Sequence, residues 1–267
     1  MNEAFPCQLI IDPPADGAWN MALDEALLQF AAEEGIASLR FYQWQTPTLS
    51  LGYFQQYEDR QNHPPSLGAA VVRRQSGGGA ILHDREITYS ISLPKMHPLA
   101  KDAQSLYNTV HKTIATILEG HLPQGHRVSL FEQDLAAGNE EPFLCFQRRA
   151  RGDLVYQLIE DDSPMAAKKI LGSAQRRSRG AVLQHGSLLL ERSLFSPELP
   201  GLNDLSGISL TRAALIEELR TKLLQALYLY DSLCEINPNV YPSAHRCYNR
   251  KYGNALWTKR HLTHGVL

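Results

Sequence analysis

A run of three glycines, at the end of an expected strand, has the clearest chemical character in this sequence. The segment RRQSGGGAILHD holds Gly77 to Gly79, preceded by Arg73 and Arg74 and followed by His83. Glycine adopts backbone angles that other residues avoid, and its amides can approach a carbonyl or a phosphate closely. No Gly-Lys-Ser/Thr follows, so the segment is neither a P-loop nor a Rossmann fingerprint. A plain hairpin turn is the alternative, but the flanking charged and imidazole side chains favour a binding site.

Two further segments place reactive or small residues in strand context. KKILGSAQRR leads from a lysine into a Gly-Ser-Ala turn, and VLQHGSLLL places His185 and Gly186 inside an apolar strand. Glycine and histidine within a strand can mark a close approach of the backbone to a ligand. A buried core histidine with satisfied hydrogen bonds is the alternative for His185.

The third feature is Cys145, in the apolar segment PFLCFQ. A lone cysteine among aromatic and aliphatic residues is most simply a small buried hydrophobe, and a nucleophile is the second interpretation. The other cysteines are Cys7, Cys234 and Cys247. None forms a C-x-x-C pair, so we expect no metal site. Few, scattered cysteines suit a reducing cytoplasm.

Composition narrows the class of protein that must position these residues. The 267 residues include 26 Lys+Arg and 28 Asp+Glu, for a net charge of −2. This balance argues against a dedicated nucleic-acid binder. With 43% hydrophobic and 20% charged residues, the chain is typical of a globular protein with one large domain. No apolar run is long enough to span a membrane and no signal peptide is evident, so we expect a cytoplasmic protein without a membrane partner.

Hydrophobic periodicity predicts strands in groups with helices between them. One helix begins after Asp16 and ends at Gly35, a second begins near Asp102, and a third covers 211–230. Expected strands cover 9–12, 38–44, 48–55, 69–75, 86–94, 127–131, 152–160, 168–175 and 182–190, with 9–12 at a sheet edge. Strands joined without intervening helices favour antiparallel pairing, so the fold class is α+β around a mostly antiparallel sheet.

Together, these segments resemble the lipoate–protein ligase and octanoyl/lipoyl transferase family. The similarity rests on DGAWNMALDEALL, LRFYQWQTPTLSLGYFQ, RRQSGGGAILHDREITYS, KKILGSAQRR, VLQHGSLLL and KYGNALWTKR, and it spans roughly residues 10–257. It implies a biotin/lipoate-ligase catalytic domain, related to class II synthetase cores, with helices flanking the sheet. We expect a single domain over residues 1–267 and no accessory C-terminal domain.

The resemblance also implies an activity. In the branch of octanoyltransferases that acts on the glycine-cleavage H protein, the acyl-carrying cysteine lies in a Cys-Phe pair eight residues before an acidic-Leu-Val strand. Here Cys145-Phe146 precedes Asp153-Leu154-Val155 by that spacing. We therefore expect octanoyl or lipoyl transfer through a Cys145 acyl-enzyme, with Lys169 beside the thiol and the acyl carbonyl. Acyl carrier protein or a lipoyl protein would be the donor, and a lipoyl-domain or H protein the acceptor.

Two alternatives remain open: an ATP-dependent lipoate–protein ligase, which would need ATP and Mg²⁺, and a non-catalytic acyl- or partner-binding relative. The transferase requires no cofactor. By the same resemblance, the residues expected to bind the acyl substrate are Arg74, Ser76, Gly77, Gly78, Gly79, Ala80, His83, Gly172, Ser173, Ala174, His185 and Gly186.

Two segments depart from that branch. The stretch LIEDDSPMAAK is longer than the usual turn, and QRRARG after the Cys-Phe pair is more basic. Extra length at a polar hairpin tip is thermodynamically cheap. Six arginines are candidates for a face that docks an acidic partner, with a solvated rim as the alternative: Arg148, Arg149, Arg151, Arg176, Arg177 and Arg179.

Overall fold

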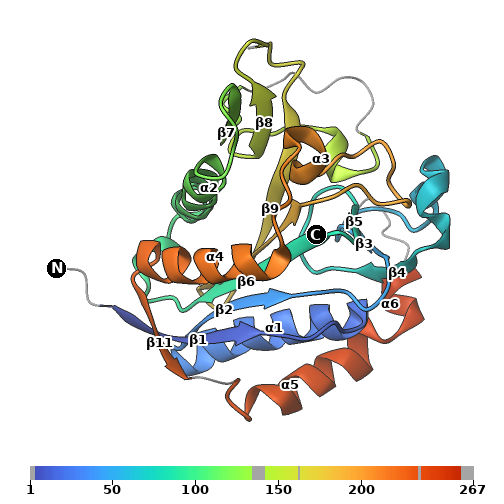
Figure 1. Ribbon diagram of the computed structural model, residues 1–267. Helices are drawn as coiled ribbons and strands as arrows, with labels where there is room; N and C mark the ends of the chain where they lie inside the picture. Colours follow the sequence, from blue (N-terminus) through green and yellow to red (C-terminus); the bar gives the residue numbers. More distant parts are fainter. Residues whose placement is uncertain (1–3, 134–141, 162, 234–235, 260–267) are drawn as a thin grey trace.

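Strands and helices alternate in groups along the chain (Figure 1). The structure is a computed structural model, and it describes residues 4–133, 142–161, 163–233 and 236–259. The strands are β1 (Phe5–Ile11), β2 (Ala37–Tyr42), β3 (Thr48–Leu51), β4 (Ala70–Arg73), β5 (Ile81–His83), β6 (Glu86–Leu93), β7 (His126–Leu130), β8 (Leu154–Leu158), β9 (Lys168–Ser178), β10 (Ala181–Leu189) and β11 (Leu229–Leu233). The α-helices are α1 (Gly17–Glu34), α2 (Ala103–Glu119), α3 (Leu202–Ser206), α4 (Arg212–Ala226), α5 (Val240–Cys247) and α6 (Ala255–Lys259).

Two sheets organise the described residues. The larger has the order β11-β1-β2-β6-β10-β9-β8-β7, and the smaller has the order β4-β3-β5. Most neighbouring strands are antiparallel, which confirms the expected α+β fold with a mostly antiparallel sheet. The β1–β2, β1–β11 and β3–β4 pairs are parallel. Helix α1 connects β1 to β2, and a crossover of this kind returns the chain in the same direction.

Helix α1 forms where the sequence predicts it. The side chain of Asp16 accepts a hydrogen bond from the amide of Trp19 at 2.8 Å, and Gly35 ends the helix with φ of 73°. Its apolar residues Leu23 and Leu27 pack with Val240 of α5, and Figure 1 shows α5 lying along α1 at the lower edge of the molecule. None of the helices in the described ranges is long and apolar enough to cross a bilayer.

Side-chain alternation along β2 separates an apolar face from a polar one. Leu39 and Phe41 join the largest core cluster, which includes the apolar stripes of α2 and α4. Arg40 and Tyr42 point the other way and contact Asp24 of α1. The face of the sheet under α1 therefore carries buried polar groups, and these groups reach the candidate site.

Two expectations about elements were wrong. The strand that begins the chain is not at an edge, because β11 pairs outside β1. The helix predicted over 211–230 ends at Ala226, since Tyr228 adopts a positive φ of 53° and the chain then enters β11. The leucine spacing of α4 continues past this point, so periodicity alone does not reveal the end of the helix.

Candidate active site

Cys145 and Lys169, which come from separate segments, meet in the folded chain. Cys145 begins a short 3₁₀ turn (Cys145–Gln147) and is partly exposed, whereas Lys169 lies on β9 and is buried. The Lys169 Nζ atom is 3.5 Å from the Cys145 Sγ atom, although 24 residues separate them in the chain. A lysine amine beside a thiol is the arrangement expected for a cysteine nucleophile assisted by a cation.

A buried carboxylate completes this cluster. Asp153 lies immediately before β8, and its Oδ2 atom is 2.8 Å from Lys169 Nζ. Burial alone would lower the pKa of Lys169, but Cys145 and Asp153 raise it above its ordinary value. In the sequence, Asp153 marks the spacing from Cys145 but carries no motif that would assign it a role. Its position, directly before a strand that pairs with the strand of Lys169, was the available signal.

The glycine-rich loop lies directly against Cys145. A Cβ atom at Gly79 would sit 3.1 Å from the Cys145 amide nitrogen. The amide of Ala80 donates to the carbonyl of Phe143 at 3.0 Å, and the amide of Cys145 donates to the carbonyl of Ala80 at 2.8 Å. Gly78 has φ of +93°, a conformation that favours glycine. The three glycines thus form a turn whose backbone is tied to the backbone of the candidate nucleophile.

Arg74 organises this loop. Its Nη2 atom donates to the carbonyls of Gly77 (2.8 Å) and Gly79 (2.7 Å), and its Nη1 atom donates to the carbonyl of Ser50 (2.8 Å). Burial lowers the pKa of Arg74 to about 10. Because a trans peptide directs its C=O and N–H to opposite sides, the amide of Gly78 points away from Arg74. The loop can therefore present N–H groups to a ligand.

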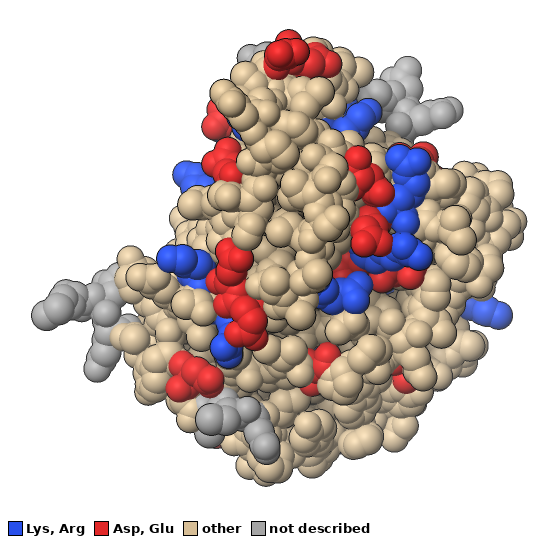
Figure 2. Space-filling model, in the orientation of Figure 1, with Lys and Arg blue, Asp and Glu red and all other residues tan. Residues whose placement is uncertain are grey.

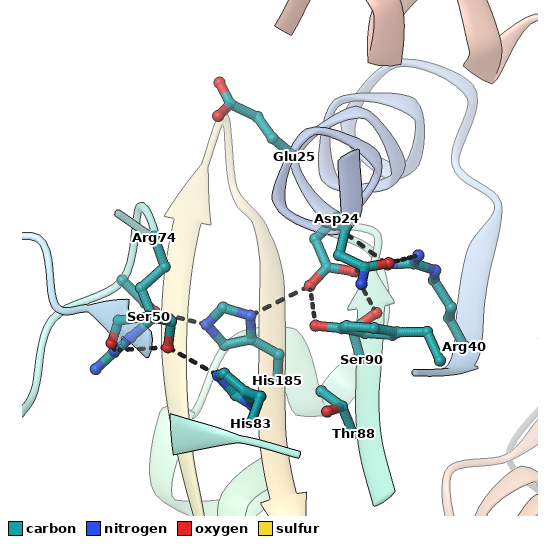
Figure 3. Close-up of polar contacts among 12 residues, drawn as sticks. Asp24, Glu25, Arg40, Ser50, Arg74, His83, Thr88, Ser90 and His185 are labelled. Atoms are coloured by element: carbon teal, nitrogen blue, oxygen red, sulfur yellow. Dashed lines mark hydrogen bonds and ion pairs between the residues drawn. The ribbon is translucent and has the colours of Figure 1, made fainter. Parts of the chain in front are cut away.

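His185 links the loop to the interior through a chain of hydrogen bonds, drawn in Figure 3. Its Nε2 atom is 2.6 Å from the Ser76 hydroxyl, and its Nδ1 atom is 3.2 Å from Asp24 Oδ2. Asp24 also accepts from Arg40 (2.8 Å), Tyr42 (3.0 Å) and Ser90 (2.7 Å). A carboxylate only accepts, so the Nδ1 atom of His185 carries a proton toward Asp24.

His83 is held by a second chain of the same kind. Its Nε2 atom is 2.8 Å from the Ser50 hydroxyl, its Nδ1 atom is 2.5 Å from Glu86 Oε1, and its ring stacks on Trp44 with centroids 4.0 Å apart. Figure 3 shows the rings of His83 and His185 close together. Both rings line one small pocket, about 20 Å³ in volume. With every ring nitrogen engaged, the two histidines offer mainly carbon atoms to that pocket.

The remaining expected binding residues fall into two groups. Ala174 and Gly186 line the pocket, and a Cβ atom at Gly186 would lie 2.3 Å from Ser173 Oγ. Ser173 instead faces α2, where its hydroxyl bonds His111 Nε2 at 2.7 Å and the Tyr89 hydroxyl at 2.6 Å. Gly172 lies against the Lys169 side chain. A pocket of this volume holds about one water, so an acyl chain bound there would displace flexible side chains such as Met21.

The outer side of the glycine loop borders a larger groove, about 1010 Å³ in volume. Gly78 and Gly79 line it, together with Phe54, Phe143 and Arg148. Because Gly79 lies against the Cys145 backbone, the groove adjoins the segment that carries the candidate nucleophile.

The six arginines proposed as one docking face have different surroundings. Arg149 donates to the carbonyl of Ala167 at 2.6 Å, Arg179 pairs with Glu33 at 2.7 Å, and Arg177 donates to the carbonyl of Ala100. Figure 2 shows basic and acidic side chains beside one another on the face it presents, and acidic groups at the tip of the β8–β9 hairpin. Arg149, Arg177 and Arg179 are thus engaged within the chain, and a common docking face for the six arginines stays a prediction.

The other described cysteines have environments unsuited to nucleophiles. Burial raises the pKa of Cys7 to about 12, and burial also raises the pKa of Cys247. Cys234 lies outside the described residues. Within those residues, no group of three His, Cys, Asp or Glu side chains is arranged to hold a metal ion.

Comparison with solved structures shows which proteins share this fold. A bi-partite lipoate protein ligase from Thermoplasma acidophilum superimposes with a TM-score of 0.70 at 19% identity, covering 98% of this chain and 100% of that one. Lipoate-protein ligase A bound with ATP also superimposes with a TM-score of 0.70 at 19% identity, covering 97% and 99%. At this identity the likeness shows the fold, and it agrees with the fold expected from the sequence.

Comparison with curated relatives shows the family to which the sequence belongs. Octanoyltransferase LipM of Anoxybacillus flavithermus is 38% identical in an alignment of 191 positions that covers 67% of this chain and 64% of the relative. Octanoyltransferase LipM of Bacillus cereus is 32% identical in an alignment of 232 positions that covers 75% of this chain and 78% of the relative. The chain thus spans slightly less than two thirds of the length of several relatives. The model of the lipoyl protein ligase A/B catalytic domain matches residues 16–209, and this chain belongs to that family.

Proposed function

We propose that this chain is an octanoyltransferase that carries the acyl group on Cys145. The observation that carries the proposal is the 3.5 Å contact between Cys145 Sγ and Lys169 Nζ, beside a glycine loop in which the carbonyls of Gly77 and Gly79 accept from Arg74. The names of its relatives support octanoyl as the group transferred. A carrier-protein thioester is the proposed donor, and a lysine of a lipoyl-domain protein, such as the glycine-cleavage H protein, is the proposed acceptor.

In the first step, the Cys145 thiolate attacks the carbonyl carbon of the donor thioester. A new C–S bond forms to Cys145, and the C–S bond to the carrier breaks, so the carrier leaves as a thiolate and charge is conserved. Negative charge develops on the carbonyl oxygen during the attack. Lys169 and the amides of the glycine loop are the groups near Cys145 that can stabilise it.

In the second step, the neutral amine of the acceptor lysine attacks the acyl-enzyme. A C–N bond forms, the C–S bond to Cys145 breaks, and the Cys145 thiolate is restored beside Lys169. The amine loses one proton, and the departed carrier thiolate gains one through solvent. Over the cycle, one thioester and one amine become one amide and one thiol.

This route needs no ATP and no other cofactor, because the thioester already supplies an activated acyl group. The family fold also supports ATP-dependent ligation, so the two must be separated by experiment. We expect octanoyl carrier protein, without ATP, to add one octanoyl mass to the enzyme as a hydroxylamine-labile adduct. Adding the acceptor should move that mass to the acceptor. Acceptor labelling from free octanoate that requires ATP, without an adduct on Cys145, would contradict the proposal.

A further inference from the structure

We infer that Asp153, oriented by Tyr107, is a positioning residue that holds Lys169 as a charged hydrogen-bond donor to Cys145. The reactive unit is then a Cys145–Lys169–Asp153 triad in which the lysine keeps its proton throughout the cycle. This inference rests on the proposed function for its kinetic consequence. Its structural part concerns only the state of Lys169 and Cys145.

Asp153 is a buried carboxylate with only 2% of its surface exposed. Its Oδ2 atom accepts from the Ala150 amide at 2.7 Å and lies 2.8 Å from Lys169 Nζ. Its Oδ1 atom accepts from the Tyr107 hydroxyl at 2.9 Å. Because donors on both oxygens fix the carboxylate, it holds the lysine in one position. A single rotatable contact would leave the lysine free to move.

A β-bulge turns Lys169 toward Asp153. Leu154 pairs with Leu171, but Val155 pairs with Lys169, so Ile170 is an extra residue in β9. Ile170 and Leu171 are consecutive, and both are buried in the same core cluster. In a regular strand Lys169 would share a face with Leu171 and point into that core. The extra residue re-aims it to the opposite face, as bulges near active sites commonly do.

Two glycines leave room for this arrangement. A Cβ atom at Gly172 would lie 2.5 Å from Lys169 Cε and 2.8 Å from its Nζ atom. A Cβ atom at Gly152 would lie 3.0 Å from the Tyr107 ring, and Gly152 has φ of +93°. Gly172, which lies within β9 and not in the turn expected from the sequence, therefore has a packing role toward the lysine. The bulge, Tyr107 and the two glycines all place Lys169 Nζ between Asp153 and Cys145.

The charge of Lys169 follows from its surroundings. Its side chain is 3% exposed, and a cation buried to that extent without a partner tends to lose its proton. The Asp153 carboxylate is the counterion that opposes this loss. Lys169 therefore acts as a donor to the thiolate and to the developing oxyanion, and it does not act as the base for the acceptor amine. Replacing Asp153 with asparagine keeps the shape but removes the counterion.

The test compares Asp153→Asn with wild type by two measurements. Iodoacetamide alkylation of Cys145 across pH reports thiolate formation, and single-turnover acylation by octanoyl carrier protein reports the first step. We expect the alkylation midpoint to move to higher pH. We expect acylation to slow by about 10²-fold, the size of effect that loss of a positioning contact can produce. Asp161→Asn, the same change at an exposed position of the β8–β9 hairpin, is the matched control and should behave as wild type.

A double variant separates positioning from general structural support. In a Lys169→Ala background, Asp153→Asn should slow acylation little further, because both changes remove the same interaction. If the two losses add in full, Asp153 acts independently of Lys169 and the inference is wrong. It is equally wrong if Asp153→Asn leaves both the alkylation profile and acylation unchanged.

A second variant, Tyr107→Phe, keeps the inference testable if far-UV circular dichroism shows that Asp153→Asn misfolds. Tyr107→Phe removes one hydrogen bond to Asp153 and keeps the ring, so this variant should shift the same two measurements in the same direction by a smaller amount. If Asp153→Asn does not fold, an unchanged Tyr107→Phe profile overturns the inference. If wild type itself forms no octanoyl adduct, the proposed function fails, while the alkylation profiles still decide the role of Asp153.

Discussion

Two buried carboxylates, Asp24 and Asp153, flank the candidate site and invite comparison. Each is almost fully buried, and each holds a nitrogen-bearing side chain that reaches toward the glycine loop or Cys145. Asp24 accepts hydrogen bonds from Arg40, Tyr42, Ser90 and His185. Asp153 accepts from Tyr107 and Ala150 and pairs with Lys169.

The two carboxylates differ in the group that each one reaches through its nitrogen-bearing partner. Through His185, Asp24 reaches the hydroxyl of Ser76, which begins the glycine loop, and its charge is balanced inside the protein by Arg40. Through Lys169, Asp153 reaches the sulfur of Cys145. We therefore propose that similar chemistry serves two purposes: the first carboxylate fixes a loop, and the second tunes the proposed nucleophile. Substitutions near Asp24 should cost mainly stability, and those near Asp153 mainly rate.

The largest expected effect on the reactive side is loss of the thiol itself. Cys145→Ala should abolish the octanoyl adduct and turnover, because the Cys145 thiol is in hydrogen-bond contact with a buried lysine, whereas burial raises the thiol pKa of Cys7 and of Cys247. Intact-mass analysis after mixing with octanoyl carrier protein measures this directly. Cys7→Ala and Cys247→Ala are the controls and should acylate normally. A labile adduct that persists on Cys145→Ala would place the acyl group elsewhere.

Lys169→Ala should come next, with a loss of about 10²–10³ in acylation rate. A free thiol near pKa ~8.5 is already a few per cent thiolate at neutral pH, so full ionisation adds only roughly 10- to 30-fold. Part of that gain is offset because a less basic thiolate is less nucleophilic. The remainder of the loss must come from the developing oxyanion.

Lys169→Arg sharpens the same prediction. A planar guanidinium differs in shape and in hydrogen-bond directions from a compact ammonium, so the rescue should be poor. Gly172 leaves little spare room beside the lysine side chain, which adds a steric reason. Iodoacetamide alkylation against pH, measured beside turnover, separates the two contributions of the charge. If Lys169→Ala leaves the alkylation midpoint unmoved and turnover survives, Lys169 neither lowers the pKa of the thiol nor stabilises the oxyanion.

The contrast between the two carboxylates also shows how far sequence reasoning reaches. The glycine loop, Cys145 and Lys169 are visible as motifs because each depends on local residue types. Asp153 and Asp24 are not visible in this way, since their meaning depends on partners such as Tyr107 and His185 that lie 46 and 161 residues away. A motif identifies a side chain, but it does not identify what that side chain contacts.

Backbone irregularities limit the prediction of elements in the same manner. The bulge lies in β9, where Ile170 is the extra residue opposite the step from Leu154 to Val155, and it decides where Lys169 points. A strand predicted from residue types does not reveal it. Tyr228 adopts a positive φ that non-glycine residues seldom use, so no stop signal separates α4 from β11. Conversely, Asp16 and Gly35 are strong local caps, and the bounds of α1 were predictable to within one residue.

On the structural side, Asp24→Asn should destabilise the fold by about 3–5 kcal/mol, because it leaves the Arg40 guanidinium buried with Asp12 as its remaining carboxylate partner. Urea unfolding at neutral pH measures the loss. Glu25→Gln is the matched control on the next residue of α1. Glu25 points away from the cluster in Figure 3 and pairs with the partly exposed Lys251, so its loss should be smaller.

The same carboxylate predicts a dependence on pH. Burial alone would raise the pKa of Asp24, but the hydrogen bond from His185 and the charge of Arg40 hold it below its ordinary value of 3.8. A carboxyl whose pKa is lowered by folding contributes stability above its unfolded pKa, and that contribution disappears as the pH falls through the folded value. Wild type should therefore lose stability below about pH 4, and Asp24→Asn should lose less over the same range. Parallel acid-unfolding curves for the two proteins would contradict this.

In the glycine loop, neighbouring positions serve as their own controls, and the smallest effect of all is expected at Gly77. Gly78→Val should lose activity while remaining folded, because Gly78 has φ of +93° and a Cβ atom there would lie 3.2 Å from the Arg74 Nη2 atom. Strain of this kind costs about 1–3 kcal/mol, which is enough to shift a turn tied to Cys145. Gly77 has only the Phe54 ring nearby, at 3.8 Å, so Gly77→Ala should acylate within about two-fold of wild type. Single-turnover acylation and thermal unfolding of both variants test this. If Gly78→Val turns over normally, the loop is a turn without a role in acyl binding, and Ser76 and His185 then belong to the fold alone.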